Sequence, residues 1–114
     1  MADRGMEQEP DLDLAIVIVN YNTRELLRDC LSSIFASRLA CSYQVFVVDN
    51  ASRDGSADMV ADSFPQVRLL RQQDNAGYAA ANNAGLRAAG FGGAQVPRYA
   101  LLLNPDTLLQ PDDL

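Results

Sequence analysis

Short apolar runs alternate with segments of helical periodicity along this chain, and this alternation constrains the fold more than any other feature. Leu14–Val19 and Val45–Val48 are continuous apolar runs, a pattern typical of strands buried on both faces of a sheet. Val67–Leu70 is more amphipathic and predicts a strand nearer a sheet edge, whereas Tyr99–Leu103 predicts a fourth buried strand. The resulting β-α-β-α-β-α-β order predicts an α/β fold with a parallel, right-handed, doubly wound sheet.

The segments between these runs predict helices. Apolar residues from Leu26 to Phe35 recur at spacings of one, three and four, which gives a single apolar stripe. Asn22 or Thr23 is the candidate N-cap of this helix. Further helices are predicted at residues 57–64 and 78–89, and the first turn of another at residues 111–114.

The composition excludes several kinds of chemistry. The 114 residues carry 9 basic and 15 acidic side chains, for a formal net charge of -6, and all nine cations are arginines. Without histidine there is no Ser-His-Asp nucleophile and no His-ligated zinc site. Without lysine there is no Schiff base and no Walker-type phosphate lysine. Since an acidic chain binds the phosphate backbone poorly, no nucleic-acid partner is expected.

Residues 1–13 carry five carboxylates and little apolar area, and predict a flexible acidic leader rather than a secretory signal. The longest apolar run, Leu14–Val19, is too short to cross a membrane. We therefore expect a cytoplasmic location, with peripheral membrane attachment left open for the full-length protein. Cys30 and Cys41 fit neither a disulfide framework nor a metal cluster, so both are expected to be reduced, partly buried thiols.

Each apolar run is followed, at its carboxyl end, by a cluster rich in Asn and Asp. The clusters are Asn20-Tyr21-Asn22, Asp49-Asn50, Asp74-Asn75-Ala76-Gly77 and Asn104-Pro105-Asp106. One such cluster would be an ordinary turn, because Asn, Asp and Gly are the usual turn residues. Ligands of open parallel sheets bind outside the carboxyl ends of the strands, so four clusters at this edge predict one binding site.

The side chains in these clusters suit a nucleotide. Amides and carboxylates match the edge of a base and the hydroxyls of a ribose, and an ionised Asp49 can accept two hydrogen bonds. Phosphates are harder to hold at an acidic site without lysine. A divalent cation on Asp106 would bind carboxylate and diphosphate oxygens together, and Arg53 and Arg71 can add charge-assisted contacts. Asp106 is explained equally well as a turn former.

Four motifs carry a resemblance to the family-two inverting glycosyltransferases. Residues 16–22, with the helix that follows, and residues 47–56 are similar to the opening motifs of that family. Residues 75–85 and 103–107 are similar to its branch that includes rhamnosyltransferases. Val-Val-Asp-Asn alone is a weak signal, but the four motifs together, in the family's order over residues 14–114, are specific.

The resemblance implies a GT-A glycosyltransferase domain, of which residues 14–114 are the Rossmann-like, nucleotide-sugar-binding N-terminal part, truncated at the C-terminus. Its ligand would be a UDP- or dTDP-sugar, with Asp49 accepting a hydrogen bond from the base. Asp106 would bind Mn or Mg at the family's Asp-x-Asp position, where Asn104 replaces the first acid and adds no charge. The implied nucleotide and sugar pocket contains Asn20, Tyr21, Asn22, Asp49, Asn50, Asn75, Gly77, Asn82 and Asn104.

The implied reaction is inverting transfer of the sugar to a saccharide or lipid-linked acceptor, as in bacterial cell-wall or polysaccharide biosynthesis. A base deprotonates the acceptor hydroxyl while the metal stabilises the leaving diphosphate. The family's general base is an acidic residue expected beyond Leu114, so no catalytic residue is assigned. Asp112 and Asp113 are better explained as complements to a helix dipole.

Other functions remain open to different degrees. The alternative to a glycosyltransferase fragment is a nucleotide-binding or oligomerising module without catalytic turnover. A homodimer is plausible, because half a domain exposes apolar surface that a second half would cover. A nicotinamide-binding domain needs a Gly-x-Gly-x-x-Gly turn where this chain has residues 20–25, Asn-Tyr-Asn-Thr-Arg-Glu. A phosphoacceptor signalling domain needs an acidic pair after the first strand and a lysine after a later one, and this chain has neither.

Overall fold

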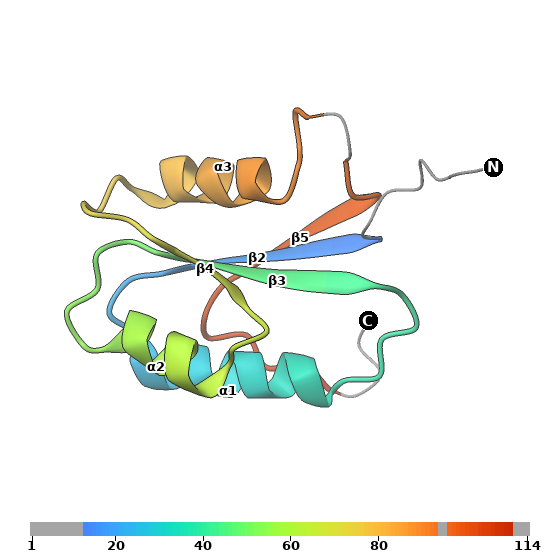
Figure 1. The fold of residues 1–114 in the computed structure, drawn as a ribbon. Coiled ribbons are helices and arrows are strands. Elements are labelled where there is room, and N and C mark those ends of the chain that lie inside the picture. Colours follow the sequence, from blue (N-terminus) through green and yellow to red (C-terminus); the bar gives the residue numbers. More distant parts are fainter. Residues whose placement is uncertain (1–12, 94–95, 111–114) are drawn as a thin grey trace.

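The computed structural model describes residues 13–93 and 96–110 (Figure 1). The predicted leader, apart from Asp13, and the predicted helix turn at residues 111–114 lie outside these residues. Asp13 is joined to the sheet end, because its amide donates to Ser42 Oγ at 3.0 Å and its carbonyl accepts from the Tyr99 amide at 2.9 Å.

Within residues 13–93 and 96–110, four strands and three helices alternate in the predicted order. The strands are β2 (Leu14–Asn20), β3 (Tyr43–Asp49), β4 (Arg68–Arg71) and β5 (Tyr99–Leu103). The helices are α1 (Arg24–Ala36), α2 (Ser56–Ser63) and α3 (Tyr78–Ala88). The three strand pairs of the described residues are parallel and their order in the sheet is β4-β3-β2-β5, so the predicted α/β fold is confirmed.

Both faces of the sheet are covered, as in a doubly wound fold. In Figure 1, α1 and α2 lie below the sheet and α3 lies above it. Ile16 and Val47 belong to the core on the side of α1 and α2, whereas Val17 and Val48 face α3. The central strands β2 and β3 therefore bury side chains on both faces, which explains their continuous apolar sequence.

The predicted apolar stripe of α1 is confirmed. Leu27, Cys30, Leu31 and Ile34 are all buried completely against the sheet. Burial of a Leu or Ile side chain stabilises a fold by about 2 kcal/mol, so this stripe is a main attachment of α1.

The register of the strands brings their carboxyl ends to one edge. Asn20 pairs with Asp49, and Asp49 pairs with Arg71. On the other side of β2, Ile18 pairs with Leu103, so Asn104 begins just beyond that edge. The loops that follow β2, β3 and β4 gather at the left of Figure 1. The sequence clusters are thereby brought together.

Strand β5 differs from the prediction of a buried strand. Tyr99 is 69% exposed and Leu102 is 46% exposed, although Leu101 and Leu103 pack against the core beside α1. Within the described residues, β5 pairs with β2 and forms the sheet edge opposite β4. An apolar run does not distinguish a central strand from an edge strand, since that depends on which neighbours cover it.

Gly85 sits where α3 approaches the sheet most closely. A Cβ atom at this position would lie 2.5 Å from Val17 Cγ1 and 3.1 Å from Val48 Cγ2. The glycine is thus required by packing, although it lowers the helix propensity of the alanine-rich segment.

We predict that Gly85→Ala lowers the free energy of unfolding by about 1–3 kcal/mol, because overpacking outweighs the gain in helix propensity. Urea denaturation followed by circular dichroism measures the change. Asn83→Ala, at an exposed position of the same helix, is the matched control and should be neutral or slightly stabilising. A Gly85→Ala chain as stable as wild type would show that α3 can move away from Val17 without cost.

Candidate functional site

A cavity of about 430 Å³ opens at the carboxyl ends of the strands. Its walls combine apolar surface with amides, and Asp106 is the one ionisable carboxylate among the described residues that line it. None of these lining residues is an arginine. They are Val19, Tyr21, Thr23, Leu26, Asn50, Asn75, Tyr78, Asn104, Pro105 and Asp106.

Half of the residues expected in the pocket line this cavity: Tyr21, Asn50, Asn75, Asn104 and Asp106. Asn20, Asp49 and Asn82 are buried close to it, and Asn22 and Gly77 lie in its supporting loops. Val19, Thr23, Leu26, Tyr78 and Pro105 were not expected. Most of them lie next to or within an Asn/Asp cluster in the sequence, and this position was the feature that could have indicated them as lining residues.

Asn20 and Asp49 form a buried junction beneath the cavity. The Asn20 amide Nδ2 donates to Asp49 Oδ1 at 3.0 Å. Ser52 donates to the same carboxylate twice, from Oγ to Oδ1 at 2.7 Å and from its backbone amide to Oδ2 at 3.0 Å. Asp49 is only 3% exposed, and these three hydrogen bonds compensate the burial of its charge.

The loops that follow β2 and β3 are tied to each other. The Asn22 side-chain Oδ1 accepts a hydrogen bond from the Arg53 backbone amide at 2.7 Å, and the Asn22 backbone amide donates to Ser52 Oγ at 2.9 Å. Asn22 has φ 53° and Ala51 has φ 66°, both in the left-handed region. This region is unfavourable for Ala, so the surrounding hydrogen bonds hold the loop in a strained shape.

Asp54 connects the N-termini of two helices. Its Oδ2 accepts the Arg24 amide at 2.9 Å at the start of α1, and its Oδ1 accepts the backbone amide of Ser56 at 3.0 Å and the Ser56 hydroxyl at the start of α2. Thr23 occupies the N-cap position of α1 as predicted, but its hydroxyl donates to Asn20 Oδ1 at 2.5 Å instead of capping the helix. Sequence reasoning missed Asp54 because α1 is capped from a distant loop.

The pKa of Asp54 is lowered from its ordinary value of 3.8. Desolvation favours the neutral acid, but hydrogen bonds from the Ser56 hydroxyl and from backbone amides, including that of Arg24, favour the carboxylate and outweigh it. The ionised side chain also lies at the positive ends of α1 and α2.

Asn50 carries an unused acceptor at the cavity. The residue is 2% exposed, and its Nδ2 donates to the Gly77 carbonyl at 3.3 Å. Its Oδ1 has no partner among the described residues, and the same is true of Oδ1 of Asn82 on α3. A buried acceptor without a partner costs about 1–3 kcal/mol, so such an atom on a residue that lines a cavity indicates a missing ligand donor or water.

A turn before α3 shapes the opposite wall. Asn75 Oδ1 accepts the Gly77 amide at 3.1 Å, and Gly77 has φ 92° and ψ 164°, which favours glycine. This turn starts α3 so that Tyr78 reaches across the cavity, and its hydroxyl donates to Asn104 Oδ1 at 3.4 Å.

Asp106 is both in a turn and at the cavity, so the two explanations for this residue are compatible. The Thr107 amide donates to the Asn104 carbonyl at 3.0 Å, which closes a turn with Pro105 and Asp106 at its centre. The Cys30 thiol approaches the same carbonyl at 3.9 Å. Burial and the nearby Asp106 charge raise the pKa of Cys30 to about 11, so the thiol remains a hydrogen-bond donor. Both cysteines are free, as predicted.

The donor set for a metal is small. Within residues 13–93 and 96–110, no three His, Cys, Asp or Glu side chains are grouped as metal ligands. Asp106 offers a charged oxygen, and Asn104 lines the same cavity with a neutral amide. Hard cations prefer six or more oxygen ligands, so these residues fit a cation that obtains most of its ligands from diphosphate and water.

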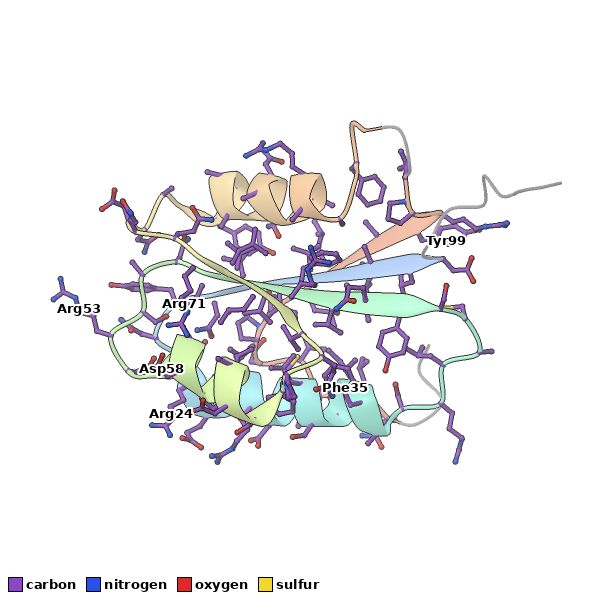
Figure 2. The ribbon with its side chains drawn as sticks, in the orientation of Figure 1. Arg24, Phe35, Arg53, Asp58, Arg71 and Tyr99 are labelled. Carbon is purple, nitrogen blue, oxygen red and sulfur yellow. The ribbon has the colours of Figure 1, made fainter. Side chains whose placement is uncertain are left out.

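The two arginines expected near the site lie outside the cavity. Arg71 Nη1 is 3.0 Å from Asp58 Oδ1, and Figure 2 shows these side chains together above α2, whereas Arg53 extends away from the fold. Arg53 lines a second cavity of about 430 Å³, which shares Tyr21 and Asn75 with the first. The described residues that line the first cavity therefore contribute no positively charged side chain.

In the part of the chain that the structure describes, no helix has the length and apolar character needed to cross a bilayer.

Comparison with known families and proteins gives a consistent picture. The family described as Glycosyl transferase family 2 matches residues 15–114. The chain is 30% identical over 79 residues to the uncharacterized glycosyltransferase YibD of Escherichia coli, and 29% identical over 77 residues to the glycosyltransferase AglE of Haloferax volcanii. These matches cover 67% and 64% of this chain but only 22% and 25% of the two relatives.

Solved structures share the fold. TarS of S. aureus, residues 1–349, superposes with a TM-score of 0.74 at 17% identity, over 89% of this chain and 29% of that chain. The mannosyltransferase PcManGT of Pyrobaculum calidifontis, in complex with GDP-Man and Mn2+, superposes with a TM-score of 0.71 at 23% identity, over 96% of this chain and 32% of that chain. The expected GT-A architecture is thus confirmed at the level of the fold.

We predict that Asp54→Asn destabilises the fold by about 1 kcal/mol near neutral pH, because the amide loses an acceptor at one of the two helix starts. Since the folded pKa lies below 3.8, the carboxylate stabilises wild type above that pH, and the stabilisation is lost as the pH falls through the folded value.

Urea denaturation at a series of pH values tests this prediction. Stability of the Asp54→Asn chain should fall less steeply than that of wild type below pH 3.8. Asp29→Asn, which removes an exposed carboxylate in the middle of α1, is the matched control. Equal acid sensitivity of Asp54→Asn and wild type would contradict the double-capping role.

Proposed function

This chain belongs to glycosyl transferase family 2, and on that premise we propose that its 430 Å³ cavity binds the nucleotide of a nucleotide-diphosphate sugar. The chain spans about a quarter of the length of the curated relatives, so the glycosyl transfer itself is a proposal about the whole protein. Ligands of the structural neighbours support the assignment, since TarS was solved in complex with UDP and with UDP-GlcNAc, and PcManGT in complex with GDP-Man.

The observation that carries the proposal is Asn50, which lines the cavity and whose buried Oδ1 has no hydrogen-bond partner among the described residues. The N–H group of a pyrimidine or purine base would supply the missing donor. We assign base recognition to Asn50 rather than to Asp49, because the Asp49 carboxylate already accepts from Asn20 and Ser52. Asn20 and Asp49 then act as supports that fix the position of Asn50.

The remaining walls suit the rest of a nucleoside. The Tyr21 ring is 46% exposed and offers an aromatic face on which a base can stack. Asn75 lines the cavity with amide groups that match ribose hydroxyls. Asn22 and Gly77 contribute through loop geometry, since they bond residues of the loops that form the wall, and Asn82 contributes through its buried position on α3.

Asp106 is proposed to hold a divalent cation, Mn or Mg, together with the diphosphate. Such a cation neutralises the diphosphate and stabilises it as a leaving group. Mn2+ in the PcManGT complex supports this assignment, and so does the lining of the cavity, whose described residues include no arginine that could neutralise a diphosphate. Asn104 is proposed to offer its amide to a phosphate or sugar oxygen beside the cation.

The finer activity follows as part of the same proposal. We propose inverting transfer, as in the rhamnosyltransferase-like branch, to a saccharide or lipid-linked acceptor. Inversion needs a base to remove the acceptor proton. The one carboxylate in the described cavity wall, Asp106, is assigned to the cation, so the base is placed outside this wall.

We predict that Asn50→Ala weakens binding of the cognate nucleoside diphosphate by about tenfold, because one hydrogen bond to the base is lost. Isothermal titration with UDP, dTDP and GDP measures the affinity, and circular dichroism confirms the fold. Asn83→Ala is the control, because it makes the same Asn-to-Ala change at an exposed position that does not line the cavity. Unchanged affinity in a folded Asn50→Ala chain would remove base recognition from this residue.

We also predict that Asp106→Asn abolishes the increase in nucleotide affinity that Mn2+ produces, while affinity without metal is kept or slightly improved. The amide has nearly the same shape as the carboxylate but lacks its charge. The same titration is run with Mn2+ and with EDTA, and Asp62→Asn, an exposed site on α2, serves as control. If Asp106→Asn retains the full metal effect, the cation is held elsewhere.

A further inference from the structure

The segment that carries Asp106 is attached to α1. After β5 ends, residues 104–110 run down from the sheet and across α1 in Figure 1. Leu109 packs against the core cluster that contains Leu31 and Ile34 of α1. The segment is thereby placed against a helix that is itself firmly buried.

Two polar side chains on one face of α1 hold this segment. Ser33 Oγ accepts the Leu109 amide at 3.0 Å and donates to the Cys30 carbonyl at 2.8 Å. The Cys30 thiol points to the Asn104 carbonyl at 3.9 Å, the same oxygen that closes the turn around Asp106 through the Thr107 amide. Both ends of the segment 104–109 are therefore bonded to α1.

We propose that Ser33 and Cys30 are positioning residues, which fix the Asp106 turn so that its carboxylate faces the cavity. The proposal rests on the proposed function, in that Asp106 is taken to hold the cation that accompanies a diphosphate. Neither side chain lines the cavity, so each acts through the backbone of the segment that it bonds.

Geometry explains why such positioning is needed. Asp106 is exposed and lies in a short turn beyond an edge strand, where few contacts restrict it. A cation to which the described cavity wall offers one carboxylate depends on the placement of that side chain. Bonds from α1 at both ends of the segment restrict the turn before the ligand arrives, which lowers the ordering cost of binding.

The test compares UDP affinity with Mn2+ and UDP affinity with EDTA by isothermal titration. In Ser33→Ala, the ratio of the two affinities should fall by about fivefold, the effect of one lost hydrogen bond, while affinity in EDTA stays at the wild-type value. Ser33→Thr keeps the hydroxyl and should restore the ratio. Ser32→Ala, at the adjacent exposed position, is the matched control and should leave both values unchanged.

Several results would overturn the inference. They are a wild-type ratio in Ser33→Ala, an equal loss of affinity with and without Mn2+, or a Ser33→Thr chain that behaves like Ser33→Ala. If Ser33→Ala fails to fold, Cys30→Ala replaces it, with the same expected fall in the ratio and the same contrary results. A wild-type chain that binds none of UDP, dTDP or GDP would instead overturn the proposed function, and this inference with it.

Discussion

The rest of the site depends on the hydrogen bond from the Asn20 side-chain amide to the Asp49 carboxylate. It joins the last residues of the two central strands, at a point where both side chains are almost completely buried. A buried carboxylate is costly unless its oxygens are bonded, and Ser52 provides the remaining bonds from the loop after β3. The shape of both loops, and with it one wall of the cavity, depends on this junction.

Two sets of hydrogen bonds extend from the junction of Asn20 and Asp49. Toward the helices, Ser52 and Arg53 bond Asn22, and Asp54 caps both α1 and α2. Toward the cavity, the next residue, Asn50, donates to the Gly77 carbonyl, and its Oδ1 has no partner in the part of the chain that the structure describes. Asn20 and Asp49, whose side chains bond each other and Ser52, do not line the cavity, whereas Asn50, whose Oδ1 has no partner among the described residues, does line it. This division separates supporting residues from the residue proposed to contact ligand.

Much of the fold could be predicted from the sequence. The continuous apolar character of β2 and β3 follows from helices on both faces, and parallel pairing places the Asn/Asp clusters at one edge. The exposure of β5 could not be predicted, because its apolar run resembles that of a central strand. The need for Gly85 was also hidden, since it arises from the distance between α3 and Val17.

The position of the site in the fold could be predicted from the sequence more accurately than the contacts that its side chains make. Side chains at a strand end can point into a cavity or into a neighbouring loop, and partners distant in sequence decide which. Ser52 and Asn20 bond Asp49 beneath the cavity, whereas Asn50 remains in its wall. In the same way, α1 holds the segment of Asp106 through contacts more than 70 residues apart in sequence.

The central claim is that a nucleoside diphosphate occupies the 430 Å³ cavity. Amide chemical-shift mapping of the 15N-labelled chain during titration with UDP, dTDP or GDP in the presence of Mg2+ tests it most directly. The account predicts saturable shifts concentrated at Tyr21, Asn50, Asn75, Tyr78 and Asp106. Shifts confined to the second cavity, around Gln72 and Gln73, or no saturable shifts with any of the three nucleotides, would contradict it.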